Sequence, residues 1–261
     1  MEINKIYCES NLETMSRMAD NFIDLTVTSP PYDNLRDYKG YSFPFEEIAK
    51  ELYRVTKDGG IVVWIVSDAI IDGSKSCTSF NQCLFFKDIG FKIHDVMIWS
   101  KDTFTYPSKN RYRNTFEYMF ILSKNSPKTF NPIIDKKNKW ANTKVHGTSR
   151  NKKGDTFVKS NNNKTNVLDY GVRFNIWNNP TEKNSSMIKH PAMFPEKLVE
   201  DHILSWSNEN DLVYDCFGGS GTTAKMAHKW KRNWILSEIS KEYVEMAEKR
   251  IAPYLAQTFL F

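Results

Sequence analysis

The chain has 261 residues, of which 40% are hydrophobic and 14% aromatic, and its formal net charge is +5. This length allows one large domain with a sizeable core, with or without an insertion, while no apolar run reaches the roughly 20 residues of a transmembrane helix. The N-terminus also lacks the apolar core of a signal peptide, so we expect a soluble, cytoplasmic protein with no membrane partner. The cysteines have no CxxC spacing and no histidine partners, so we expect reduced thiols and no metal site.

Strand and helix signals alternate along the first 130 residues. Continuous apolar runs indicate buried strands, whereas apolar residues three and four positions apart indicate helices. The expected strands are Lys5–Cys8, Phe22–Thr28, Ile61–Val66, Ile93–Trp99 and Phe116–Leu122, and the expected helices are Leu12–Met18, Phe45–Val55 and Phe80–Ile89. We expect Gly59-Gly60 to end the second helix. The alternation predicts an α/β fold with a parallel sheet covered by helices on both faces.

The second expected strand ends in Ser29-Pro30-Pro31-Tyr32. The two prolines remove backbone donors, so the chain cannot continue as a central strand, and the resulting stiff turn offers a hydroxyl, carbonyl oxygens and a flat ring. Such a turn can hold a planar group that carries an NH₂, by accepting its hydrogens and stacking on its face. Taken alone, the stretch is also compatible with an ordinary strand exit.

The composition changes between residues 131 and 186. Lys, Asn, Thr, Ser and Gly dominate, basic residues outnumber acidic ones, and Trp140, Phe157, Tyr170, Phe174 and Trp177 are spaced among them. This composition is typical either of a solvated insertion or of a segment that faces nucleic acid, where cations contact phosphates and aromatic rings stack on bases.

Regular structure is expected again near the C-terminus. The expected elements are a helix over Pro195–Trp206, a strand over Leu212–Phe217, a helix over Ala224–Trp230, a strand over Asn233–Ser237 and a helix over Lys241–Ile251 with Ser240 as its N-cap. A glycine-rich turn, Asp215 to Gly221, therefore lies between a strand and a helix, and Glu238 follows at the end of the next strand. This arrangement is typical of a nucleoside-binding α/β unit, in which the carboxylate accepts hydrogen bonds from ribose hydroxyls.

Together, Thr28-Ser29-Pro30-Pro31-Tyr32 and Asp215-Cys216-Phe217-Gly218-Gly219-Ser220-Gly221-Thr222-Thr223 resemble two motifs of the DNA amino-methyltransferases. In that family the first motif is catalytic and the second holds S-adenosyl-L-methionine. The motif order resembles the family's β group, and His190-Pro191-Ala192-Met193-Phe194-Pro195 resembles a stretch that packs beside the cofactor. Cys216 replaces a common proline, and we expect it to pack without taking part in chemistry.

The resemblance implies a doubly wound, Rossmann-like methyltransferase sheet with an inserted target-recognition segment. It divides the chain into a catalytic half (1–130), an insertion (131–186) and a cofactor-binding half (187–261). The implied catalytic residues are Ser29, Pro30, Pro31 and Tyr32. The implied cofactor-binding residues are Asp215, Phe217, Gly218, Gly219, Ser220, Gly221, Thr222, Glu238, Phe194 and, in a place where the family often has an acidic residue, Ser10 with Glu9 adjacent.

The implied reaction is methylation of an exocyclic amino group in double-stranded DNA, on a base flipped out of the duplex. Ser29 and the Ala192–Pro195 sequence favour cytosine N4 as the target, and adenine N6 is the alternative. Methylation of RNA, a small molecule or a protein, or DNA binding without catalysis, stays open. A homodimer and a cognate restriction endonuclease are partners that the sequence leaves undecided.

Overall fold

A computed structural model describes residues 1–31, 43–105, 109–159, 162–181 and 194–256. These residues form two compact units, the first comprising residues 1–131 and 175–261 and the second residues 132–174. Each unit is described separately. The predicted residue Tyr32 and the stretch 190–193 lie outside the described residues.

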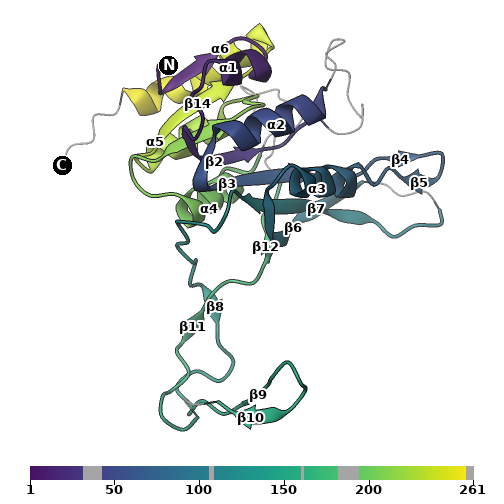
Figure 1. The fold of residues 1–261 in the computed structure, drawn as a ribbon, viewed down its shortest axis with the longest axis vertical. Coiled ribbons are helices and arrows are strands. Elements are labelled where there is room, and N and C mark those ends of the chain that lie inside the picture. The colour runs from purple at the N-terminus through teal and green to yellow at the C-terminus, as the bar shows by residue number, and fades with distance from the viewer. Residues whose placement is uncertain (32–42, 106–108, 160–161, 182–193, 257–261) are drawn as a thin grey trace. The chain divides into compact units, whose positions relative to one another are not determined.

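The first unit is built on an eight-stranded sheet with the order β1-β14-β13-β2-β3-β7-β6-β12 (Figure 1). Seven of these strands point the same way, and only β7 is antiparallel to its neighbours. The strands are β1 (Lys5–Tyr7), β14 (Asn233–Ser237), β13 (Leu212–Asp215), β2 (Ile23–Thr28), β3 (Thr56–Val66), β7 (Asn114–Ser123), β6 (Lys92–Thr105) and β12 (Ile176–Asn178). The strands β6 and β7 are consecutive in the chain, with no helix among the described residues between them, and they pair antiparallel instead of through a crossover.

Helices cover both faces of this sheet (Figure 1). The buried cluster on one face includes side chains of α1 (Asn11–Ser16), α2 (Phe45–Val55) and α3 (Thr78–Asp88). The other three helices, α4 (Glu196–Trp206), α5 (Thr222–Lys229) and α6 (Lys241–Leu255), pack against β1, β2, β13, β14 and one another. A small hairpin of β4 (Ile70–Ile71) and β5 (Ser74–Lys75) follows β3. The predicted doubly wound α/β fold is confirmed.

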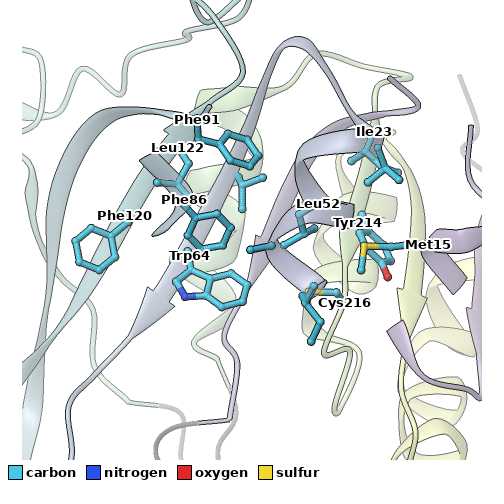
Figure 2. Close-up of a cluster of buried hydrophobic side chains, with 14 of the residues drawn as sticks. Met15, Ile23, Leu52, Trp64, Phe86, Phe91, Phe120, Leu122, Tyr214 and Cys216 are labelled. Carbon is cyan, nitrogen blue, oxygen red and sulfur yellow. The ribbon is translucent and has the colours of Figure 1, made fainter. Parts of the chain in front are cut away.

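Aromatic rings form a large part of the core under α2 and α3 (Figure 2). Trp64 is fully buried, and the centroids of its ring and the Phe86 ring are 5.1 Å apart. Its indole nitrogen donates to Gln82 Oε1 at 2.8 Å. The ring centroids of Phe86 and Phe91 are 5.7 Å apart. Because the one polar atom of Trp64 is paired, the ring can be buried without an unsatisfied donor.

Three details differ from the sequence-based expectations. The helix α2 ends at Val55, and Gly59-Gly60 lie inside β3, near an irregularity in its pairing with β2, so they do not cap the helix. Ser240 is the N-cap of α6, as expected, but its hydroxyl makes no cap hydrogen bond to the helix. The strand β12 falls within the compositional insertion 131–186 but pairs with β6 in the main sheet, with Trp177 only 5% exposed. A three-residue strand among Asn and Lys residues gives almost no periodic signal.

The second unit consists of two small antiparallel ribbons. One pairs β8 (Lys136–Lys137) with β11 (Tyr170–Gly171), and the other pairs β9 (Thr148–Arg150) with β10 (Thr156–Val158). Exposed aromatic side chains lie beside cations: Lys136 is 4.8 Å from the ring centre of Phe174. In the part of the chain that the structure describes, no helix is long and apolar enough to cross a membrane.

Candidate active site

The two predicted motifs lie at the ends of neighbouring parallel strands. β2 and β13 pair with Leu25 opposite Val213 and Thr26 opposite Tyr214, so Thr28 and Asp215 come out at the same edge of the sheet. Loops at the carboxyl ends of parallel strands form the usual ligand-binding crevice of such sheets. The sheet therefore brings Ser29-Pro30-Pro31 and the glycine-rich turn together, although they are far apart in sequence.

The carboxylate of Asp215 joins the two motifs directly. Oδ1 accepts from Thr28 Oγ1 at 2.7 Å and from the Phe217 amide at 3.0 Å, and Oδ2 accepts from Thr223 Oγ1 at 2.7 Å. The residue is only 2% exposed. Burial raises the pKa of Asp215, and these three hydrogen bonds oppose the rise. Its role in cofactor binding stays a prediction, and the geometry favours an indirect one in which the carboxylate shapes the turn.

Packing explains two of the glycines in the turn. At Gly218 an added Cβ would lie 3.0 Å from Leu236 Cβ on β14. At Gly221, where φ is +78°, it would lie 2.9 Å from Ala247 Cβ on α6. A side chain at Gly221 would therefore meet both backbone strain and a steric clash. These two glycines are needed to bring the turn close to β14 and α6, before any ligand is considered.

Glu238 closes the other side of the turn. Its Oε2 accepts from the Gly219 amide at 2.8 Å and its Oε1 accepts from the Ser240 amide at 2.8 Å. Burial raises the pKa of Glu238, while the backbone hydrogen bonds from Ser240 and Gly219 lower it in part. Each carboxylate oxygen can accept two hydrogen bonds, so the half-buried side chain still has capacity for ligand hydroxyls.

The segment that carries Ser10 begins beside Glu238. β1 pairs with β14, and the Glu238 amide donates to the Tyr7 carbonyl at 3.0 Å. Ser10 itself is the N-cap of α1, and its Oγ accepts from the Glu13 amide at 3.2 Å. This capping role gives Ser10 a structural reason to be present, and its contact with the cofactor stays a prediction.

The remaining predicted residues lie around the same edge. The centroid of the half-buried Phe217 ring lies 5.7 Å from that of Phe43 and 6.3 Å from that of Trp64. Phe217 is therefore at the border of the aromatic core. Phe194 is half-buried and stands two residues before α4. Ser220 and Thr222 are each 4% exposed. At the catalytic turn, Pro30 is buried, whereas Ser29 and Pro31 are half-buried.

Several residues of this edge were missed by sequence reasoning. Thr28 and Thr223 both bind Asp215, and Asn11 Nδ2 donates to the Cys216 carbonyl at 3.1 Å. Only their positions inside or beside the motifs could have drawn attention to the two threonines. Cys216 is 2% exposed and burial raises the pKa of its thiol, in agreement with a packing role. Within the described ranges, no group of three His, Cys, Asp or Glu side chains could hold a metal ion.

The contribution of the Thr28–Asp215 hydrogen bond to stability can be tested by a matched pair of substitutions. Thr28→Val removes one donor from a buried carboxylate, so we expect the free energy of unfolding to fall by about 1–3 kcal/mol. Thr26→Val is the control, because Thr26 Oγ1 is buried and has no hydrogen-bond partner among the described residues, so this change should be neutral or stabilising. Urea unfolding measures both. Equal losses of stability in the two variants would show that the Thr28 hydrogen bond contributes nothing.

Comparisons with known proteins find a family model and relatives that match most of this chain. The family model N6_N4_Mtase, described as DNA methylase, matches residues 23–249. The orphan methyltransferase M.BamHII of Bacillus amyloliquefaciens is 55% identical over 244 residues, which cover 91% of this chain and 92% of that protein. The type II methyltransferase M.BglII of Bacillus subtilis is 30% identical over 254 residues, covering 94% of this chain and 68% of that protein.

Solved structures share the fold. The PvuII DNA methyltransferase, named as cytosine-N4-specific, superposes with a TM-score of 0.68 at 23% identity, covering 98% of this chain and 87% of that one. The complex of M1.HpyAVI with S-adenosyl-L-methionine (SAM) gives a TM-score of 0.60 at 21% identity, covering 94% and 98%. The resemblance seen in the sequence is confirmed: with its two motifs on adjacent strands and a family match over residues 23–249, this chain belongs to the N6_N4_Mtase family of DNA methylases, the DNA amino-methyltransferases.

Proposed function

We propose that this protein transfers a methyl group from SAM to the exocyclic amino group of a base in double-stranded DNA, most favourably cytosine N4. One observation carries the proposal. The buried hydrogen bond from Thr28 to Asp215 holds the Ser29-Pro30 turn beside the glycine-rich turn, at the carboxyl edge of a sheet where such folds bind ligands. A donor and an acceptor of a methyl group must be held side by side, and this edge offers one turn for each.

The residues around the glycine-rich turn fit SAM. Glu238 keeps acceptor capacity for a ribose hydroxyl, and α5 begins directly after Gly221 with the partial positive charge of a helix N-terminus. When bound, SAM supplies an electrophilic methyl group on a sulfonium sulfur. M1.HpyAVI, which shares the fold, has been solved with this molecule. These features support the proposed cofactor residues.

The catalytic turn provides acceptors for the amino group of the base. The nitrogen lone pair of such a group is delocalised into the ring, which makes it a weak nucleophile. Acceptance of its two hydrogens by Ser29 Oγ and the Pro30 carbonyl would favour a pyramidal nitrogen with its lone pair directed at the methyl group. Positioning and electrostatic stabilisation would then supply most of the rate acceleration. Stacking on the ring of Tyr32 would hold the flipped base.

Cytosine N4 is favoured over adenine N6 by the sequence of the turn. The family's cytosine enzymes mostly carry serine at the position of Ser29, and the PvuII enzyme that shares the fold is named cytosine-N4-specific. At 23% identity that likeness is one of fold alone, and adenine N6 stays the alternative target. The cognate endonuclease stays an open prediction, because the relative that is 55% identical is named an orphan methyltransferase.

The cofactor assignment predicts a pH-dependent affinity for SAM. Ionised Glu238 is the stronger acceptor of ribose hydroxyls, and burial raises its pKa, so affinity should weaken as the pH falls from 7 and should do so at a higher pH than for an ordinary glutamate. Glu238→Ala should weaken binding at pH 7 by about 1–3 kcal/mol and flatten this pH dependence. Calorimetric titration measures both effects. Glu245→Ala, an exposed change on α6, is the control, and equal affinities in the two variants would contradict the assignment.

The catalytic assignment predicts a selective loss of rate. Ser29→Ala should lower the single-turnover rate of methyl transfer by roughly 10²–10³, while the affinities for DNA and SAM stay within a few-fold, because the hydroxyl acts mainly in the transition state. Tyr32→Phe keeps the ring and should stay active. Mass spectrometry of digested DNA will identify the product as N4-methylcytosine or N6-methyladenine. A fully active Ser29→Ala enzyme would mean that the turn is only a strand exit.

We also propose that the second unit contacts the DNA backbone. In the turn between β9 and β10, Asn151 Oδ1 accepts from the amides of Lys153 and Asp155, both at 2.9 Å, and this turn presents the exposed Lys152 and Lys153. A fixed turn with two adjacent cations is suited to binding phosphates.

Replacing both lysines with glutamine should therefore reduce the salt dependence of DNA affinity, by about one unit of slope for each phosphate that the protein no longer neutralises, without changing SAM affinity. Lys92→Gln is the control, because this exposed lysine starts β6 at the amino ends of the parallel strands, opposite to Ser29. Fluorescence anisotropy at several salt concentrations gives the slopes. An unchanged slope would place the two lysines on a solvated face.

A further inference from the structure

The guanidinium of Arg250, on α6, reaches the glycine-rich turn. Its Nη1 donates to Ser220 Oγ at 2.9 Å and to Thr222 Oγ1 at 2.8 Å, and it lies 3.3 Å from the Ser220 carbonyl oxygen. The side chain of Arg250 is 9% exposed. One largely buried cation therefore binds the hydroxyl of Ser220 in the turn and that of Thr222 at the start of α5.

The other side of the same guanidinium binds the start of α4. Nη2 of Arg250 donates to Glu196 Oε1 at 2.6 Å, and Lys225 Nζ donates to the same oxygen at 2.5 Å. Glu196 directly follows Phe194-Pro195 in sequence. Burial alone would raise the pKa of Glu196, but the hydrogen bonds from Lys225 and Arg250 lower it below its ordinary value, so the carboxylate is ionised at neutral pH.

The backbone of α6 also lies close to the turn. Gly221 leaves no room for a side chain next to Ala247, one helical turn before Arg250. The planar fork of an arginine can donate in two directions at once, which a lysine ammonium on a flexible stem does less well. Arg250 thus binds two segments that are separate in the sequence: the glycine-rich turn, and the segment Phe194–Glu196 that leads into α4.

We propose that Arg250, paired with Glu196, is a positioning residue for the cofactor. It fixes the glycine-rich turn and the Phe194 segment relative to one another, so that SAM affinity depends on a side chain of the last helix that need not touch SAM itself. This inference rests on the proposed function, in which SAM binds at that turn. The physical reason is preorganisation: a turn that is already held in place loses less conformational freedom when a ligand binds.

The test compares Arg250→Met with Lys225→Met. Both changes remove a cation from Glu196 and leave an unbranched apolar side chain, but only Arg250 donates to Ser220 and Thr222. We expect Arg250→Met to raise the Kd of SAM at least about 10-fold and Lys225→Met to change it by less than about threefold. Calorimetric titration well below the unfolding temperature of each variant provides the values.

Two further measurements separate positioning from a merely structural role. At saturating SAM, the single-turnover rate of Arg250→Met should return to near the wild-type value, since the chemical step is untouched. Arg250→Lys, which keeps the charge beside Glu196, should raise the Kd of SAM by less than Arg250→Met does. A loss of thermal stability in Arg250→Met with an unchanged Kd would overturn the proposal, as would equal effects of Arg250→Met and Lys225→Met. If the wild-type protein itself binds no SAM, the proposed function fails, and this inference fails with it.

Discussion

The site depends above all on a single buried carboxylate. Asp215 binds Thr28 from β2 and Thr223 from α5, two residues on opposite sides of β13 in the sequence, and it also binds the Phe217 amide at the start of the glycine-rich turn. A carboxylate at 2% exposure is stable in the fold only when such donors surround it. The three donors belong to different parts of the site. Because the buried carboxylate of Asp215 must be hydrogen-bonded to all of them, it sets the relative position of the Ser29-Pro30 turn and the glycine-rich turn before any ligand binds.

Glu238 and Arg250 extend the same principle around the glycine-rich turn. Glu238 binds the Gly219 amide, and Arg250 binds the hydroxyls of Ser220 and Thr222. The turn is thus held by the carboxylate of Glu238 directly after β14, the guanidinium of Arg250 on α6 and the carboxylate of Asp215. Charged hydrogen bonds are stronger than neutral ones, and in a partly buried position they are also less screened by solvent. A loop with few side chains of its own obtains its rigidity from the charged residues around it.

The sequence predicted the fold and the motifs well because both are local signals. Apolar runs such as Ile61–Val66 and the Pro30-Pro31 break need no knowledge of the rest of the chain, and α2 and β14 were found with their correct ends. The short strand β12 and the partners of Asp215 both depend on contacts between distant segments. Arg250 is the clearest case: within its helix it is one more basic residue near the C-terminus, and only the packing of α6 brings it to Ser220.

The order of the motifs along the chain explains how an inserted segment can lie between them. β2 and β13 are neighbours in the sheet, yet Thr28 and Asp215 are 187 residues apart, and the second unit is inserted within that interval. The entropic cost of closing a loop grows only slowly with its length, by about 0.6 kcal/mol for each doubling. Unit 1 contains both residues that flank the insertion: the Asn131 amide donates to the Ser205 carbonyl at 2.8 Å, and the Asn175 carbonyl accepts from the Ile98 amide at 2.9 Å. With its ends secured in this way, the inserted segment can change in length and sequence while the hydrogen bond that joins the Ser29-Pro30 turn to the glycine-rich turn stays the same.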